Sequence, residues 1–168
     1  KVVNGHEAEK KKAEEEKKKA EERYNAADKG KGKKEWKAAK NELRQKTRAY
    51  NKADRNYQNA QAAIDALKEV APDIFNELDN LQGPQGQNID ISVTTLESNA
   101  SYWKDGEEYE LRGGTYAVPG SGSFNSYIKD PVSGANNTIG VKLKLGVGAL
   151  ILAHEGGHCV YYSKNVRE

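Results

Sequence analysis

The chain has 168 residues and a formal net charge of +2, from 27 Lys and Arg against 25 Asp and Glu. This length suits one ordinary domain, or a small domain with an appendage. The single Cys excludes an intramolecular disulfide framework and a Cys-based zinc cluster. The longest apolar-or-Gly run covers residues 145–153, far below the roughly 18 residues that a membrane-spanning helix needs.

The sequence contains no Met, and its N-terminus lacks the apolar core of a signal peptide. We therefore expect that residue 1 is not an intact translation start. We expect a processed product or a piece of a longer protein.

Charge and glycine content change near Pro72. Residues 1–70 hold 20 Lys and Arg against 13 Asp and Glu, whereas residues 71–168 hold 7 against 12. Only three of the 16 Gly lie in the first part. The sequence therefore predicts two regions, a helical arm over 1–71 and a turn-rich domain over 72–168.

The arm begins with residues 7–28, which are almost all strong helix formers. Gly30 and Gly32 then break the helix. The second helix carries a seven-residue repeat of apolar side chains: Trp36, Leu43, Tyr50, Tyr57, Ile64 and Ala71. Three residues after the first five of these lie Ala39, Lys46, Ala53, Ala60 and Leu67.

This a/d stripe runs over five heptads and is interrupted only by Lys46. Two helices joined by a Gly-containing turn predict an antiparallel helical hairpin. The thin Ala side of the first helix, at Ala13, Ala20 and Ala27, is expected to face the Trp/Tyr stripe.

Two functions compete for this arm. A basic arm would bind nucleic acid or anionic lipid, whereas a stalk or docking hairpin would contact a partner protein or a larger parent chain. Charges of both signs are interleaved along the arm and form no phosphate-tracking patch. We therefore favour the stalk or docking hairpin and expect no nucleic-acid partner.

The second region alternates turns with short β-type runs. We expect a short helix over 72–81, strands over 88–95, 108–112, 115–118, 124–128 and 138–145, a loop over 99–106, and a final helix over 145–164. The fold class is therefore α+β, with a small, mostly antiparallel sheet followed by a largely buried helix.

The final helix carries His154-Glu155-Gly156-Gly157-His158, an H-E-x-x-H sequence. Residues at i and i+4 share a helix face, so both imidazoles can point at one metal ion. Glu155 can face a water held by that ion, which is the arrangement of a metal-assisted hydrolase. The bland alternative is two ordinary helical histidines beside a buried Glu, and the third histidine, His6, is expected at the surface.

The two motif glycines each cost the helix roughly 1 kcal/mol relative to Ala. We expect such glycines to mark the close approach of another backbone or of a ligand.

Residues 138–162 resemble the zincin metallopeptidases, with an edge strand, a turn and an active-site helix bearing HEGGH. The resemblance implies His154 and His158 as zinc ligands and Glu155 as the general base, with Zn²⁺ as the cofactor. It also implies a protein or peptide substrate lying along strand 138–145. The implied activity is a zinc-dependent endopeptidase that hydrolyses peptide bonds by Glu-assisted attack of a zinc-bound water.

A catalytic zinc needs a third protein ligand. The metzincin extension would place Gly and His at positions occupied by Tyr161 and Lys164, and that group's Met-turn is absent, so the resemblance is gluzincin-like. The third ligand is expected beyond residue 168, on another chain, or at Glu168 if the chain turns back. Asp130 is an upstream alternative.

The charged coil before Gly-rich strands also resembles the C-terminal toxin regions of bacterial polymorphic secreted toxins, such as Rhs-type effectors. That resemblance implies secretion or delivery into a target cell. The competing hypothesis is a non-enzymatic coiled-coil interaction or stalk module attached to an inactive zincin-like domain.

Overall fold

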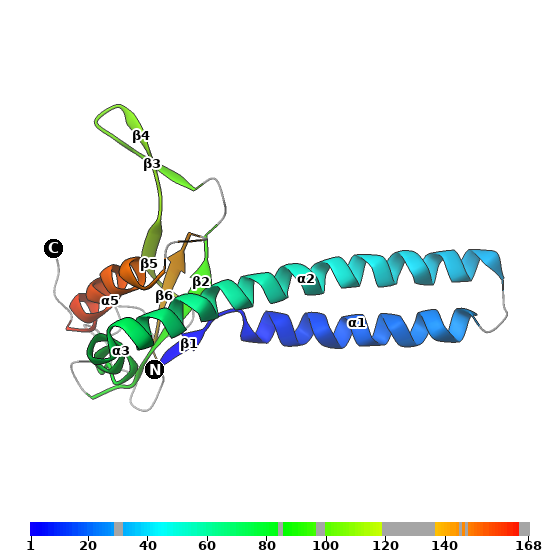
Figure 1. The fold of residues 1–168 in the computed structure, drawn as a ribbon, viewed down its shortest axis with the longest axis horizontal. Helices are drawn as coiled ribbons and strands as arrows, with labels where there is room; N and C mark the ends of the chain where they lie inside the picture. Colours follow the sequence, from blue (N-terminus) through cyan, green and yellow to red (C-terminus); the bar gives the residue numbers. More distant parts are fainter. Residues whose placement is uncertain are drawn as a thin grey trace. The chain divides into compact units, whose positions relative to one another are not determined.

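The computed structural model describes residues 1–28, 32–83, 86–96, 100–118, 137–144, 146 and 148–164. Figure 1 shows the fold, which is α+β as predicted. The elements in chain order are β1 (Val2–Asn4), α1 (Glu7–Asp28), α2 (Lys33–Val70), α3 (Pro72–Asp79), β2 (Ile89–Thr95), β3 (Ser101–Lys104), β4 (Glu107–Glu110), β5 (Gly113–Ala117), β6 (Asn137–Leu143) and α5 (Ala149–Ser163).

The chain divides into two compact units. One unit is His6–Gln58, and the other combines Lys1–Gly5 with Asn59–Glu168. The boundary between the two units thus lies within α2, after Gln58, whereas the sequence predicted a boundary between residues 71 and 72. The division differs because β1 and the last turns of α2 pack with the sheet.

The helical unit is the expected antiparallel hairpin. Its ion pairs show that the helices are antiparallel, because the partners on α2 come earlier in the sequence as those on α1 come later. The pairs are Lys10 with Asp54, Glu16 with Lys46, and Arg23 with Glu42. The Lys46–Glu16 contact measures 3.0 Å between Nζ and Oε2. This ion pair explains how a charged residue occupies a d position of the heptad stripe.

The interface between α1 and α2 contains buried alanines and lysines that lie over tyrosine rings. Ala20 of α1 and Ala53 of α2 are buried, as the heptad pattern predicts. The ammonium groups of Lys10 and Lys17, one heptad apart on α1, lie 4.4 and 4.9 Å from the ring centroids of Tyr57 and Tyr50. Cation–π contacts of this kind stabilise modestly at exposed sites, so the aromatic stripe is covered largely by lysines rather than by alanines alone.

The second unit contains a four-stranded sheet in the order β1-β2-β6-β5. β1 and β6 both pair with β2 in parallel, and β5 pairs with β6 antiparallel. The expectation of a mostly antiparallel sheet was therefore wrong, and the sheet is mixed. The reason is that β2 and β6 are far apart in the sequence and run in the same direction, and that β1, which the sequence analysis did not predict, adds a third parallel strand.

β6 lies inside the sheet, hydrogen-bonded to β2 on one side and to β5 on the other. The expectation that strand 138–145 is an edge strand open to a peptide was therefore wrong. In the described part of the chain, the edge next to α5 belongs to β5.

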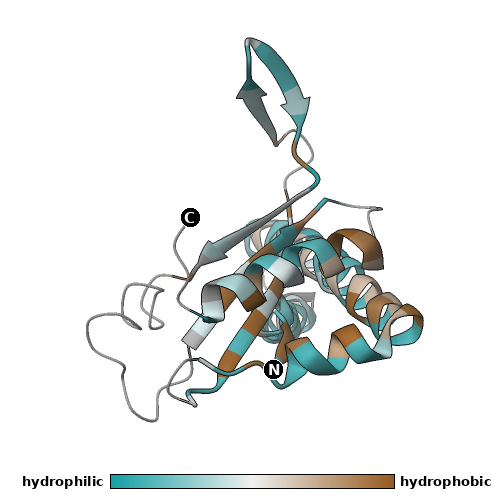
Figure 2. Cartoon of the chain, turned by 90° about the vertical axis from the view of Figure 1, so that its left-hand side faces the viewer, coloured by the Kyte–Doolittle hydropathy of each residue, from teal (hydrophilic) through white to brown (hydrophobic). Residues whose placement is uncertain are grey.

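One face of the sheet forms the core. Its alternating apolar residues meet α2, α3 and α5, and the cluster includes Ile91, Ile139, Val141, Leu67, Leu78 and Leu152. Figure 2 shows brown, hydrophobic segments on the helices and the sheet, whereas the hairpin of β3 and β4 is mostly teal. Burying apolar area at roughly 25 cal/mol per Å² makes this face the main source of stability of the unit.

The structure also bears on His6 and on two segments of the turn-rich region, 99–106 and 124–128. His6 is 8% exposed, so the expectation of a surface histidine was wrong. The expected loop over 99–106 contains β3 and an Asp105-Gly106 turn. The expected strand over 124–128 lies outside the described residues. No helix in the described ranges is long and apolar enough to cross a membrane.

The Glu16–Lys46 pair predicts a pH-dependent contribution to hairpin stability. The Lys46 ammonium lowers the pKa of Glu16 by a hydrogen bond and by its charge. A lowered folded-state pKa adds stability above the unfolded value of about 4.3, and that stability is lost as the pH falls through the folded value. We expect Glu16→Gln to melt earlier than the parent chain at pH 7 in thermal unfolding followed by helical circular dichroism.

The difference between the two proteins should shrink as the pH falls through the lowered pKa of Glu16, because the parent side chain then becomes neutral too. Glu15→Gln is the matched control, because Glu15 is exposed and lies beside Glu16. Equal melting of both variants and the parent at pH 7 would contradict the role of the pair.

Replacing each of the two motif glycines by Ala should change the free energy of unfolding in opposite directions. A Cβ at Gly156 would lie 2.6 Å from Cδ1 of the buried Leu78 on α3, whereas a Cβ at Gly157 would meet no atom of the described residues within 4 Å. Gly156→Ala should destabilise by about 1–3 kcal/mol through overpacking. Gly157→Ala should stabilise by about 1 kcal/mol through helix propensity. Urea unfolding of both variants gives the sign of each effect.

Candidate functional site

The two faces of α5 have different exposure. Leu152, Glu155 and Cys159 recur at helical spacing and are buried, whereas His154 and His158 are exposed. Because the side chains at 154 and 158 lie one turn apart, they share the outer face. The helix therefore presents both imidazoles to solvent while its other side packs into the core.

The two imidazoles converge. The Nε2 atoms of His154 and His158 are 3.3 Å apart, with ring centroids at 5.0 Å and ring planes at 80°. Two imidazole nitrogens bound to one tetrahedral zinc, each at about 2.0–2.1 Å, lie about 3.3 Å apart. The pair thus has the spacing that two ligands of one tetrahedral ion require.

Glu155 lies against strand β5. Glu155 is only 6% exposed, and its Oε2 accepts a hydrogen bond from the Thr115 hydroxyl. A Cβ at Gly113 would lie 3.1 Å from Glu155 Oε1 and 2.7 Å from the Ile151 side chain. The missing side chain at Gly113 therefore lets the carboxylate approach the edge strand.

Sequence reasoning placed Thr115 in a strand but gave it no role. Thr115 pairs with Val141 in the ladder and so belongs to the face that α5 covers. A hydroxyl at a core-facing strand position was the available signal, because such a group needs a partner when it is buried.

The described residues contain no group of three His, Cys, Asp or Glu side chains placed to hold a metal ion. His154 and His158 are the two predicted ligands that come together. Glu168 and Asp130, the third-ligand alternatives within the chain, lie outside the described residues.

Cys159 is fully buried one residue after His158. Burial, and secondarily the negative charge of Glu155, raise the pKa of its thiol to about 12. A thiol that stays protonated is neither a nucleophile nor a metal ligand at neutral pH, so Cys159 acts as a packing residue.

A shallow pocket of about 500 Å³ opens beside His154 and Glu155. Its walls include Gly113 and Ile151, which bring β5 against α5, and Tyr102 and Glu110 from the β3–β4 hairpin. The imidazole, the carboxylate and the edge strand therefore border one open space.

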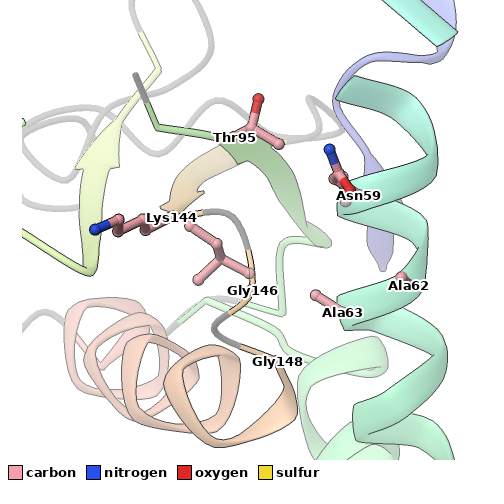
Figure 3. Close-up of a pocket in the computed structure, with 9 residues that line it drawn as sticks. Asn59, Ala62, Ala63, Thr95, Lys144, Gly146 and Gly148 are labelled. Atoms are coloured by element: carbon pink, nitrogen blue, oxygen red, sulfur yellow. The ribbon is translucent and has the colours of Figure 1, made fainter. Parts of the chain in front are cut away.

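Figure 3 shows a different pocket, bordered by Asn59, Ala62 and Ala63 of α2, Thr95 at the end of β2, and the glycines that precede α5. Among the described lining residues Lys144 alone carries a charge, and its ammonium group pairs with Glu110. The lining that the structure describes holds no carboxylate, imidazole or thiol, so it offers no alternative to the histidine site for metal-assisted catalysis.

Comparison with protein-family models, with curated proteins and with solved structures finds no match.

The Thr115–Glu155 hydrogen bond predicts a specific stability effect. Thr115→Val keeps the shape of the side chain but leaves a buried carboxylate without its donor, and this should destabilise the fold by about 1–3 kcal/mol. Thr115→Ser retains the hydroxyl and should recover most of the loss. Equal stability of the Val and Ser variants in urea unfolding would show that the bond contributes nothing.

Proposed function

We propose that this chain is a zinc-dependent endopeptidase whose metal ligands include His154 and His158. The observation that supports it is the 3.3 Å separation of the two Nε2 atoms on the exposed face of α5. The donors are also of the right kind, because neutral imidazole is a preferred zinc ligand.

Each residue has a distinct part in the proposed reaction. His154 and His158, whose Nε2 atoms converge, would hold the ion. A zinc ion held there would supply a water of lowered pKa and polarisation of the substrate carbonyl. Glu155 takes the proton from the attacking water and passes it to the leaving amine.

Thr115 and Gly113 position that base. The Thr115 hydroxyl binds Oε2 of Glu155, which limits the rotation of the carboxylate. The bare Cα of Gly113 leaves room for Oε1. A base held by packing and by a hydrogen bond stays close to its working geometry.

The alternative function is a non-enzymatic module in which the helical hairpin is the working part. It rests on the presence of two rather than three convergent ligands among the described residues. Metal content separates the two functions, because only the peptidase requires a stoichiometric ion.

We expect the purified chain to bind one zinc ion per molecule and to lose it to a chelator. His154→Ala and His158→Ala should each weaken zinc binding and abolish cleavage. Glu155→Gln should keep zinc but reduce cleavage by about 10²–10⁴-fold, because it removes the base and not a ligand. The measurements are metal analysis by mass spectrometry and cleavage of a mixed peptide library.

Glu69→Gln, an exposed carboxylate near the end of α2, is the matched control and should behave as the parent. Full cleavage by Glu155→Gln would rule out the mechanism. Absence of zinc in the parent at neutral pH would favour the non-enzymatic module.

A further inference from the structure

The β3–β4 hairpin is a surface feature that the proposed mechanism does not use. Its strands pair antiparallel with Tyr102 opposite Tyr109 and Trp103 opposite Glu108. The turn is Asp105-Gly106, with φ of 53° and 81°, which is the Asp-Gly turn that closes a two-residue hairpin. Every residue of both strands is exposed, and Figure 1 shows the hairpin extending away from the four-stranded sheet.

The hairpin exposes three aromatic side chains. Tyr102, Trp103 and Tyr109 are 46%, 70% and 42% exposed, and the two Tyr rings stack with centroids 5.6 Å apart. A two-stranded ribbon with no core beneath it is marginally stable in water. Exposed Tyr and Trp side chains are typical of a binding surface, because they offer large contact area at low entropic cost.

The hairpin is also acidic. Residues 101–110 hold four carboxylates, Asp105, Glu107, Glu108 and Glu110, and a single cation, Lys104. Glu110 is neutralised by Lys144, and Glu107 accepts a hydrogen bond from the Tyr109 hydroxyl at 3.0 Å. The remaining negative charge makes the hairpin repel nucleic acid and anionic lipid surfaces and attract cations.

Trp103 and Glu108 form the best-defined recognition point. They lie directly opposite in the ladder, so their side chains share one face of the ribbon. Ser101 donates a hydrogen bond to Glu108 Oε1 at 2.6 Å, which holds the carboxylate in place. An aromatic face beside a fixed carboxylate suits a Lys or Arg side chain, through cation–π attraction and an ion pair.

The hairpin is continuous with the candidate site. Tyr102 and Glu110 border the same pocket as His154 and Glu155. After β4 the chain passes directly into β5, which carries Thr115. A polypeptide bound along the hairpin would therefore lead toward the histidine pair.

We propose that the β3–β4 hairpin binds a Lys- or Arg-containing segment of the polypeptide substrate, with Trp103 and Glu108 as its specificity-determining residues. This inference rests on the proposed peptidase function, but the binding step does not require a metal. It can therefore be tested without cleavage.

The test measures binding of three labelled octapeptides by fluorescence anisotropy, with chelator present so that no cleavage occurs. The peptides alternate Ala with Lys, Gln or Glu. We expect the Lys peptide to bind about three- to tenfold more tightly than the Gln peptide, the range that one exposed cation–π contact and one ion pair support. The Glu peptide should bind most weakly.

Two variants locate the effect. Trp103→Ser should remove most of the preference for the Lys peptide, and Glu108→Lys should reverse it in favour of the Glu peptide. Local unfolding of the hairpin would lose binding but would not reverse the preference, so Glu108→Lys keeps the test decisive. Val70→Ser is the control for loss of an exposed apolar residue, since Val70 is 75% exposed on α2.

Equal binding of the three peptides by the parent chain, or equal effects of Trp103→Ser and Val70→Ser, would overturn the proposal. Concentration-dependent self-association that Trp103→Ser abolishes, without any peptide preference, would also overturn it by assigning the hairpin to a second copy of the chain. Absence of zinc or of cleavage would refute the peptidase function, while the Lys preference would still report on the hairpin.

Discussion

β6 is hydrogen-bonded to a neighbouring strand on each of its two sides, and the arrangement of the sheet-containing unit depends on this pairing. β2 takes one edge in parallel and β5 takes the other antiparallel, so Val141 and its alternate neighbours are buried beneath the helices. β5 is thereby placed beside α5. Only in that position does Thr115 reach Glu155, and only there does the bare Gly113 admit the helix.

Close approach of α5 is achieved at two glycines with different neighbours. Gly113 leaves space for Ile151 and Glu155, and Gly156 leaves space for Leu78 of α3. Gly in a helix costs stability through backbone entropy, and the packing of Leu78 offsets that cost at Gly156. Among the described residues Gly157 has no such neighbour within 4 Å, so their packing does not explain why the motif has a second glycine.

The two units are stabilised by different forces. The helical unit, His6–Gln58, buries little more than alanines. It is stabilised by ion pairs such as Lys46–Glu16 and by lysines that lie over tyrosine rings. The sheet unit has a contiguous apolar core. The small net charge of the chain is the sum of a basic arm and an acidic domain, and the acidic excess includes the β3–β4 hairpin.

The sequence by itself determined the features whose signals are local. The seven-residue repeat predicted the hairpin of α1 and α2, and the four-residue spacing of His154 and His158 predicted that their imidazoles meet, because helical periodicity needs only a few consecutive residues. Tertiary structure alone decided the strand order, the parallel pairing of Val2 with Ile91, and the hydrogen bond that turns Glu155 toward Thr115. These depend on register between segments far apart in the chain, and no local pattern specifies which strand lies beside which.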